Sequence, residues 1–370
     1  MAIKDTYIID GIRTPIGSFG GGLSAVRGDD LLAHSIKSLM GRLPSLAPES
    51  IEEVFIGCAN QAGEDNRNVA RMALLLAGLP TSIGGETVNR LCASGMAAAI
   101  NASRAIKDNA GELYIAGGVE HMTRAPYVLS KASGSFGRDQ KLEDSSFGWR
   151  FINPVMEHLY GVDSMGMTAE NLADEFSIAR EDQDLFALWS QQKTKEAHES
   201  GFFTDEIIPI PIPQRKGDVL WFTNDEFPKK QTTIEKLSGL RPAFRSNGTV
   251  TAGNASGLND GAAVLLIGSE EGCALAGKNP LSRILSAAVS GVAPRIMGIG
   301  PVEASKKALS RAGLSLDQMD IIEINEAFSV VALANNQALK LDDAKVNVNG
   351  GAVALGHPLG SSGCRIIVTL

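Results

Sequence analysis

The sequence predicts an α/β protein made of two similar halves, with a loop-rich lobe inserted between them. Strand-like and helix-like patterns alternate over residues 1–120 and again over residues 258–370, whereas residues 121–257 are rich in turns. Such alternation is typical of a largely parallel sheet covered by helices. We therefore predict three domains with these boundaries: an N-terminal half, an inserted loop domain and a C-terminal half.

The first half alternates regularly between short apolar runs and amphipathic stretches. Strands are predicted at residues 7–9, 54–56, 86–91 and 113–116, and helices at 29–40, 68–79 and 95–106. In the first of these helices the apolar residues recur at the helical period, so one face is expected to pack on the sheet.

The inserted lobe and the second half follow different patterns. A long helix is predicted over 168–200 in the lobe, and the prolines at 209, 211 and 213 suit an extended segment at a sheet edge. In the second half, strands are predicted at 283–289, 321–324 and 346–348, and helices at 302–312 and 327–340.

Two features of the first half recur in the second half at the same offset. The pattern at 51–57 returns at 319–325, and Ser94-Gly95 returns as Ser362-Gly363, each 268 residues later (319 − 51 and 362 − 94). Unrelated α/β units also resemble one another, but a shared offset favours duplication. Segments 89–95 and 350–363 are then equivalent, and pseudo-twofold packing is expected to bring them to one site.

Composition and charge exclude several classes of protein. The 370 residues are 44 % apolar and 21 % charged, which is typical of a globular chain and not of a disordered or fibrous one. The net charge of −8 argues against nucleic-acid and membrane partners. No apolar run approaches bilayer length and the N-terminus lacks a signal core. The four cysteines are widely spaced, so we expect a reducing, cytoplasmic location and no metal site.

Cys92 is the first candidate for chemistry, because segment 89–95 places it between a predicted strand and a helix. Free N–H groups at a helix start favour a thiolate and can donate to an oxyanion. An inert buried cysteine fits the local context equally well. The other three cysteines are expected to have packing roles: Cys58, Cys273 and Cys364.

His357 and Asn325 are the second and third candidates. Pro358 restricts the backbone of His357, and a histidine held in this way can accept a thiol proton near neutral pH. A structural histidine is the alternative, but the equivalence with the cysteine segment favours function. Asn325 follows an apolar strand, where it either caps a helix or orients a water or an oxyanion.

With these three segments in this order, the chain resembles the thiolase family over essentially its whole length. Residues 13–17 (RTPIG) and 117–122 (GGVEHM) add to the resemblance. Segments 57–66, 148–151 and 160–165 are similar to the 3-oxoadipyl-CoA thiolases within that family. The resemblance implies a layered αβαβα fold whose inserted loop domain holds CoA.

The chemistry implied by the resemblance is acyl transfer without a permanently bound cofactor, with CoA and acyl-CoA as substrates. His357 would deprotonate Cys92, and the thiolate would attack the keto carbon of a 3-oxoacyl-CoA. Asn325 would hold a water that, with His357, stabilises the oxyanion. The favoured substrate is 3-oxoadipyl-CoA, giving succinyl-CoA and acetyl-CoA. An acetoacetyl-CoA thiolase and a catalytically impaired CoA-binding protein are the alternatives.

The resemblance also implies contacts and partners. Seven positions match those at which thiolases touch the pantetheine or acyl portion of CoA: Phe244, Ala252, Ser256, Leu258, Met297, Ala327 and Phe328. Three cations of the lobe are candidates for the CoA phosphates, each weighed against a solvated surface charge: Arg215, Lys216 and Lys229. The terminal carboxylate of an oxoadipyl group would need a cation such as Arg150 or Arg71. A homodimer or homotetramer is implied as well.

Two positions depart from the family pattern. Ser164 stands where thiolases often carry a histidine. Thiolases also have a Cys-x-Gly segment well beyond the histidine, whereas thirteen residues follow His357 here (370 − 357). Cys364 is too near His357 to take that role. We therefore expect the last strands of the second half and the acid/base cysteine to be missing, and thiolysis by this chain to be weak.

Overall fold

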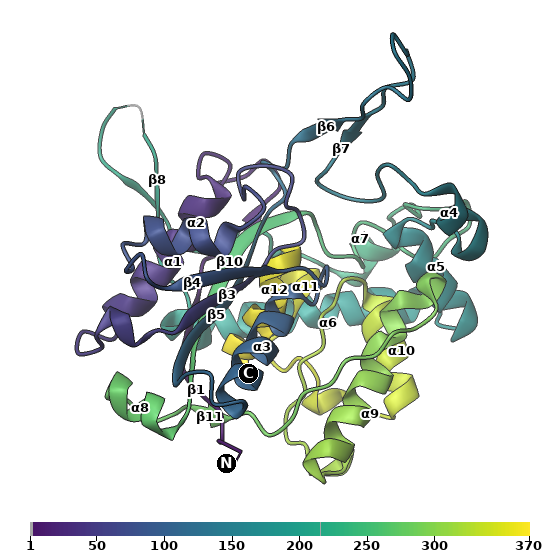
Figure 1. Ribbon diagram of the computed structural model, residues 1–370. Helices are drawn as coiled ribbons and strands as arrows, with labels where there is room; N and C mark the ends of the chain where they lie inside the picture. The colour runs from purple at the N-terminus through teal and green to yellow at the C-terminus, as the bar shows by residue number, and fades with distance from the viewer. Residues whose placement is uncertain (1–2, 215) are drawn as a thin grey trace.

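The computed structural model describes residues 3–214 and 216–370. One mixed sheet lies at the centre of its N-terminal part, with helices over both faces and further helices from the lobe and the second half beside them (Figure 1). Within the described residues, no helix combines the length and the apolar character that crossing a bilayer requires.

The central sheet has the strand order β11-β1-β10-β5-β3-β4. Its strands are β1 (Tyr7–Arg13), β2 (Gly17–Ser18), β3 (Glu53–Gly57), β4 (Gly84–Val88), β5 (Leu113–His121), β10 (Asn259–Gly268) and β11 (Ser282–Arg283), with β2 pairing the start of β10. Strand β3 is parallel to β4 and β5, but β10 is antiparallel to both β1 and β5. The prediction of a largely parallel sheet is therefore wrong.

Strand β10 is the reason for this difference, because the sequence pattern did not indicate it. All ten of its residues are buried, so it reads as a continuous apolar run without alternation. The predicted boundary after residue 257 puts this strand with the second half, whereas its hydrogen-bonded neighbours β1 and β5 belong to the first. The division into three domains stays a prediction.

Helices cover both faces of the sheet. On one face lie α1 (Gly28–Gly41) and α2 (Val69–Leu76), which pack on residues such as Val264 and Leu266 of β10. On the other face lie α3 (Ser94–Lys107) and α12 (Leu359–Thr369), against Ala263 and Leu265. Alternate residues of one strand thus serve two cores. The strands and helices predicted for the first half are confirmed as β1, β3, β4, β5, α1, α2 and α3.

The inserted lobe carries two arms that extend from the body of the molecule (Figure 1). One is the hairpin of β6 (Tyr127–Leu129) and β7 (Leu142–Asp144), and the other is the hairpin of β8 (Ile210–Ile212) and β9 (Leu220–Phe222). The extended segment expected from the prolines is confirmed by β8, in which Pro211 pairs with Trp221.

The long helix predicted over 168–200 is two helices in the structure, α5 (Met165–Glu175) and α6 (Arg180–Glu199). The chain breaks between them at Ser177, which adopts a left-handed φ of 52°. Ser164 caps α5 by accepting the N–H of Met167 at 3.3 Å. The other helices are α4 (Pro154–Tyr160), α7 (Ile234–Ser238), α8 (Glu270–Ala276), α9 (Gly300–Ala312), α10 (Ser329–Leu339) and α11 (Ala352–Leu355), and the 3₁₀ helices are η1 (Pro48–Ser50), η2 (Phe202–Asp205), η3 (Pro294–Ile299), η4 (Leu316–Gln318) and η5 (Asp343–Lys345).

The helices predicted for the second half are confirmed as α9 and α10, but its predicted strands are largely absent from the described residues. Segment 283–289 joins the sheet only through β11, and 321–324 makes a single bridge between Ile322 and Val346. The pairing of segments 321–324 and 346–348 does not extend beyond this bridge, because the next residue, Asn347, has a left-handed φ of 45°. Its side-chain amide binds both the N–H and the carbonyl of Ile324, at 2.8 and 2.9 Å, in place of a backbone neighbour.

Arg13 fastens the N-terminal strand to the lobe. Its buried guanidinium donates to both carboxylate oxygens of Asp225, at 2.7 and 3.0 Å, and to Glu206. The same group lies over the ring of Phe203. A fully buried arginine with two carboxylates ties β1 to segments that are about 200 residues away in the chain.

Candidate active site

Helices α3 and α12 approach each other backbone to backbone at two glycines. A methyl group on Gly95 would lie 2.8 Å from the amide nitrogen of Cys364, and one on Gly363 would lie 2.2 Å from that of Met96. Only glycine permits such an approach. Because Gly95 is the second residue of α3 and Gly363 the fifth of α12, the segments that precede the two helices, 89–93 and 357–358, come to the same end of the pair.

The turn that holds Cys92 is fixed by its own side chains. Ser94 Oγ donates to the carbonyl of Leu91 at 2.6 Å and accepts the N–H of Arg90 at 2.8 Å. Asn89 Oδ1 accepts the N–H of Leu91 at 3.0 Å. Leu91 itself adopts a left-handed φ of 48°, which is uncommon for a branched residue, and is 64 % exposed. Cys92 is therefore held, half-buried, on a sharp turn just before α3.

The electrostatic surroundings of Cys92 differ from those predicted. Burial raises the pKa of its thiol to about 11, and the negative charge of Glu120 adds to the rise. The expected thiolate is thus disfavoured in the free protein, because desolvation and a nearby carboxylate outweigh the favourable helix start.

Hydrogen bonds define the tautomer of His357. Ser362 Oγ donates to the carbonyl of Pro358 at 3.0 Å, which leaves its lone pair to accept from His357 Nδ1–H at 2.6 Å. The lone pair of Nε2 then accepts from Asn325 Nδ2 at 3.3 Å. We assign the proton to Nδ1 from this network, so Nε2 is the basic nitrogen.

Burial keeps His357 neutral. The side chain is 4 % exposed, and burial, followed by the charge of Arg365, lowers the pKa of its imidazole to about 3. The backbone N–H of His357 donates to Asn259 Oδ1 at 2.9 Å, which holds the residue in place. Near neutral pH the imidazole of His357 is therefore neutral and the thiol of Cys92 is protonated.

Asn325 does not cap a helix, so that alternative is wrong. Helix α10 begins four residues later, at Ser329, and its N-cap residue is Phe328. The amide of Asn325 is instead turned toward His357, and its buried Oδ1 has no hydrogen-bond partner among the described residues. A free buried acceptor next to a basic nitrogen can bind a water or a hydroxyl group.

Two buried carboxylates hold the loop around His357 at its ends. Glu326 accepts the N–H of Val353 at 3.1 Å, and Glu120 accepts the N–H of Gly360 at 2.9 Å. Glu120 was not predicted as a site residue. A single acid in the otherwise apolar strand β5 was the signal for it, since buried carboxylates are rare without a specific partner.

Several of the candidate CoA contacts lie together beside this loop. The N–H and the hydroxyl group of Ser256 both donate to the carbonyl of Ala327, at 3.0 and 2.9 Å. The ring of Phe328 packs edge-on against Phe244, with 6.1 Å between centroids. Ala252 is exposed on the same segment as Ser256, Leu258 is half-buried there, and Met297 is half-buried in η3, which packs on α5.

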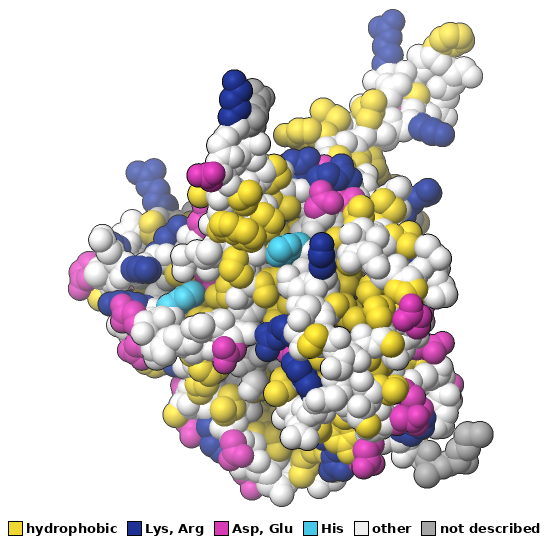
Figure 2. All heavy atoms as spheres, turned by 90° about the vertical axis from the view of Figure 1, so that its left-hand side faces the viewer, with side chains coloured by type: hydrophobic (Ala, Val, Ile, Leu, Met, Phe, Trp, Pro, Cys, Tyr) yellow, Lys and Arg dark blue, Asp and Glu magenta, His cyan; other side chains and the backbone are white. Residues whose placement is uncertain are grey.

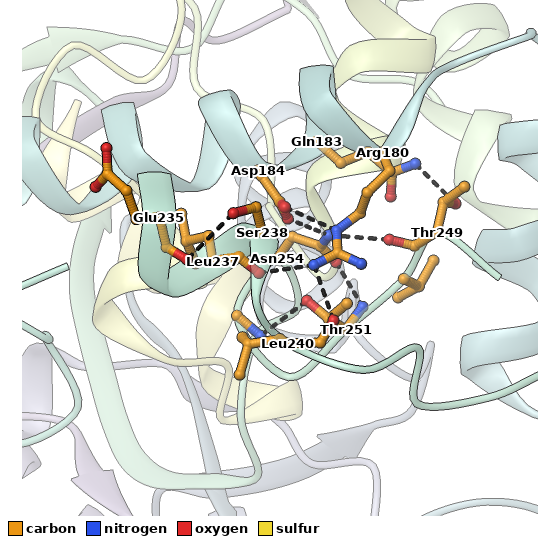
Figure 3. Close-up of polar contacts among 12 residues, drawn as sticks. Arg180, Gln183, Asp184, Glu235, Leu237, Ser238, Leu240, Thr249, Thr251 and Asn254 are labelled. Carbon is orange, nitrogen blue, oxygen red and sulfur yellow. Dashed lines mark hydrogen bonds and ion pairs between the residues drawn. The ribbon is translucent and has the colours of Figure 1, made fainter. Parts of the chain in front are cut away.

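A polar network beneath segment 249–256 explains its shape (Figure 3). Asn254 Nδ2 donates to Asp184 Oδ1 at 2.8 Å, while Asn254 Oδ1 accepts the N–H of Thr251 at 2.8 Å. Arg180 donates to Asp184 at 2.7 Å and to the carbonyls of Leu237 and Leu240. Helix α6 thereby fixes a small-residue loop in which Ala252 is exposed.

The candidate cations are placed differently. Lys229 is exposed, and its ammonium lies over the ring of Phe227, which packs on Gly257 next to the candidate CoA segment. Lys216 is exposed in the loop of the β8–β9 arm, and basic side chains mark the outer ends of the arms in Figure 2. Arg215 lies outside the described residues.

Comparisons with known proteins show what the whole chain is similar to. A family model described as "Thiolase, N-terminal domain" matches residues 6–271, and one described as "Thiolase, C-terminal domain" matches residues 278–370. Among curated relatives, a beta-ketoadipyl-CoA thiolase of Pseudomonas aeruginosa is 56 % identical over 368 residues, which cover 99 % of this chain and 92 % of the relative. A 3-oxoadipyl-CoA/3-oxo-5,6-dehydrosuberyl-CoA thiolase of Escherichia coli is 55 % identical, with 98 % and 91 % covered.

Solved structures show the same fold. A crystal structure of the Bacillus anthracis acetyl-CoA acetyltransferase superposes with a TM-score of 0.92 at 42 % identity, over 100 % of this chain and 92 % of the other. A crystal structure of human mitochondrial 3-ketoacyl-CoA thiolase in complex with CoA gives a TM-score of 0.91 at 41 % identity, over 100 % and 91 %.

Proposed function

We propose that this chain, which belongs to the thiolase family, cleaves 3-oxoadipyl-CoA with Cys92 as its nucleophile and His357 as its base. Membership follows from the two domain models that match residues 6–271 and 278–370. The chain is accordingly an acyltransferase that moves an acyl group between a cysteine and CoA. We propose in addition that its substrate is 3-oxoadipyl-CoA and that Cys92 and His357 have these two roles.

The proposed reaction has two acyl transfers. The proton of the Cys92 thiol passes to His357 Nε2 while sulfur bonds to the 3-keto carbon of the substrate. The bond between C2 and C3 then breaks, its electron pair goes to C2, and the proton held on His357 Nε2 passes to C2, which releases acetyl-CoA. In the second transfer the thiol of CoA attacks the acyl-enzyme, and Cys92 leaves as the thiol. Succinyl-CoA is the product when the substrate is 3-oxoadipyl-CoA.

The observation that carries these roles is the defined tautomer of His357. Its Nδ1–H is committed to Ser362 at 2.6 Å, so the Nε2 lone pair is the one that can accept a proton. Since the pKa of Cys92 is raised and that of His357 is lowered, the proton moves together with the attack on the carbonyl and not before it. Asn325, with its free Oδ1, is proposed to hold the water that supports the oxyanion.

CoA is proposed to lie along segment 252–258. Ser256 binds the carbonyl of Ala327 there, the neighbouring Ala255 pairs with Phe328, and Lys229 supplies a nearby positive charge for a phosphate group. Lys216 and Arg215 stay candidates for the same purpose.

The oxoadipyl group is favoured because several relatives carry that substrate in their names and because the chain offers a cation for its carboxylate. Arg71 is committed to the carbonyls of Ile83 and Thr81. Arg150 makes one longer bond, 3.3 Å, to the carbonyl of Ser145. Asn60 also donates to Ser145, and it belongs to the same loop as Ala59, which binds the side chain of Asn89 next to Cys92. Arg150 is therefore the preferred partner of the carboxylate.

A homodimer or homotetramer in the cytoplasm completes the proposal. Large apolar side chains stand exposed, among them Leu91 next to Cys92 and Leu76 at the end of α2, and the hairpin arm of β6 and β7 exposes Leu129 and Leu142. Four free cysteines suit a reducing compartment. Light scattering coupled to gel filtration measures the assembly, and a monomer at micromolar concentration contradicts it.

The proposal is tested by comparing turnover of 3-oxoadipyl-CoA with that of acetoacetyl-CoA. We expect a higher kcat/KM for 3-oxoadipyl-CoA, a covalent acyl group on Cys92 in mass spectra, and no acyl group on the Cys92→Ser variant. A preference for acetoacetyl-CoA would support the alternative substrate. Normal CoA binding without acylation of Cys92 would support a CoA-binding protein instead.

A further inference from the structure

Glu120 is a buried carboxylate that the reaction described above does not use. It is 2 % exposed and stands near the end of β5. Its two oxygens accept three backbone N–H groups, from Ala59 and Asn60 at 3.0 Å each and from Gly360 at 2.9 Å. The described residues provide no ion-pair partner for it. The thiol of Cys58 also donates to it, at 4.0 Å. A buried acid that has no cation beside it among the described residues is a costly feature, and it calls for a reason.

The three N–H groups belong to the two segments that flank the candidate nucleophile and the candidate base. Gly360 follows His357 by three residues, at the start of α12. Ala59 binds the Asn89 side chain through its carbonyl at 3.0 Å, and Asn89 in turn holds the turn on which Cys92 sits. One carboxylate thus connects the loop of His357 with the loop that supports Cys92.

We propose that Glu120 is a positioning residue for acyl transfer, which holds the loops of Cys92 and His357 in register through these three hydrogen bonds. This inference rests on the proposed roles of Cys92 and His357. Glu120 does not touch the reacting atoms. It acts by holding the two loops and by the effect of its negative charge on the nearby thiol.

The charge of Glu120 has a separate consequence for Cys92. Its field disfavours the thiolate, so the thiol stays protonated until a substrate carbonyl is in place. Burial raises the pKa of Glu120 itself to about 7, although its three N–H bonds oppose that rise, so it is largely charged at pH 8. The titratable or charged groups that face it or line the same pocket are Cys58, Glu64, Asp65, Cys92, His121 and Arg124.

Two substitutions of Glu120 distinguish its effect on the position of the two loops from the effect of its charge on the Cys92 thiol. Glu120→Gln removes the charge and sets an amide donor against the N–H groups. We expect alkylation of Cys92 by iodoacetamide at pH 8 to become several-fold faster, while kcat for thiolysis falls by at least tenfold and KM changes little. Glu120→Asp keeps the charge but shortens the side chain. For this variant we expect a lower kcat with an unchanged pH profile of alkylation.

A matched control is Glu170→Gln, because Glu170 is also fully buried and also accepts two backbone N–H groups, from Thr249 and Val250, in the lobe. It should leave the alkylation profile of Cys92 where it is. An unchanged alkylation profile together with unchanged kcat in Glu120→Gln would overturn the inference. If that variant does not fold, an unchanged kcat in Glu120→Asp overturns it.

The roles of Cys92 and Glu120 are tested independently. Full thiolysis by Cys92→Ser would refute the proposed nucleophile. The alkylation experiment, read by mass spectrometry at Cys92, reports the influence of Glu120 whether or not that residue carries the acyl group.

Discussion

Gly95 and Gly363 face each other's helices at distances that leave no room for a side chain. The contact is reciprocal, because each glycine lies against the amide nitrogen of the residue that follows the other, Cys364 and Met96. The two glycines are also 268 residues apart, which is the offset between the repeated features of the sequence. The pair places the starts of α3 and α12 side by side, as expected if the two segments are equivalent copies.

Replacing Gly363 by alanine should separate these helices. The new methyl group would lie 2.2 Å from a backbone nitrogen, which cannot move without the whole of α3. We expect a loss of roughly 1–3 kcal/mol or more in the free energy of unfolding, together with a large loss of thiolysis. Urea denaturation measures the first effect. Gly41→Ala is the control, since a methyl group there meets nothing within 4 Å. Equal stability of the two variants would contradict the role of the crossing.

The sequence indicated this helix contact because Ser94-Gly95 recurs as Ser362-Gly363, and a repeated dipeptide can be recognised without a structure. Local periodicity was also sufficient for α1, α2, α3 and the strands that α2 and α3 connect. It was insufficient for β10, whose ten buried residues show no alternation and whose position between β1 and β5 is set by tertiary pairing. The mixed sheet follows from that one strand.

In the candidate site, too, local sequence features were predictable whereas features supplied by the fold were not. Cys92, His357 and Asn325 stand in recognisable segments, so the sequence alone was enough to nominate them as candidates. The ionisation of Cys92 was predicted wrongly, because the helix start is a local feature whereas Glu120 and burial are supplied by the fold. The capping alternative for Asn325 failed for a similar reason: the start of α10 four residues later is decided by packing against segment 254–256.

The raised pKa of Cys92 leads to a prediction for its reactivity. The thiolate is the reactive form, so alkylation by iodoacetamide should quicken about tenfold for each pH unit between 7 and 10, with a midpoint near the pKa of about 11. Cys58, Cys273 and Cys364 are buried and should react far more slowly in the folded protein. Mass spectrometry locates the label. A midpoint near pH 8 would mean that the thiol is activated in the free enzyme.

Ser362 is expected to matter through the tautomer of His357. In Ser362→Ala the Nδ1–H loses its acceptor, and the competing tautomer, with a protonated Nε2, becomes populated. The loss of a hydrogen bond of about 1 kcal/mol corresponds to roughly a fivefold lower kcat, with little change in KM. Ser361→Ala is the control, because Ser361 is its equally buried neighbour and makes no contact with the imidazole. Equal effects of the two substitutions would argue against the assigned tautomer.

Arg150 is expected to select for a carboxylate on the acyl chain. A charged hydrogen bond of about 1.5–3 kcal/mol corresponds to a ten- to hundredfold loss of kcat/KM for 3-oxoadipyl-CoA in Arg150→Ala. Acetoacetyl-CoA has no such carboxylate, so its kcat/KM should change by less than about twofold. In Arg71→Ala the ratio of the two substrates should not shift, since Arg71 binds backbone carbonyls. The same loss for both substrates in Arg150→Ala would remove Arg150 from the acyl site.

Asp225 should carry a large share of the stability that joins β1 to the lobe. Burial alone would raise the pKa of its carboxyl, but the charge of Arg13, followed by the close contact with His198 and the hydrogen bonds from Arg13, holds that pKa well below its usual range. Asp225→Asn leaves Arg13 buried with one carboxylate fewer. We expect the free energy of unfolding at pH 7 to fall by about 3–5 kcal/mol, the cost typical of breaking a buried pair.

The pH dependence of stability provides an independent check on Asp225. A carboxyl whose folded pKa is lowered stabilises the protein fully above the pKa of the unfolded chain, about 4, and this stabilisation is lost as the pH falls toward the folded value. Wild type should therefore lose stability more steeply below pH 4 than Asp225→Asn does, as measured by urea denaturation. Glu175→Gln, at the exposed pair with Arg295, should cost no more than about 0.5 kcal/mol at pH 7. Parallel curves for wild type and Asp225→Asn would show that the buried pair contributes nothing to acid stability.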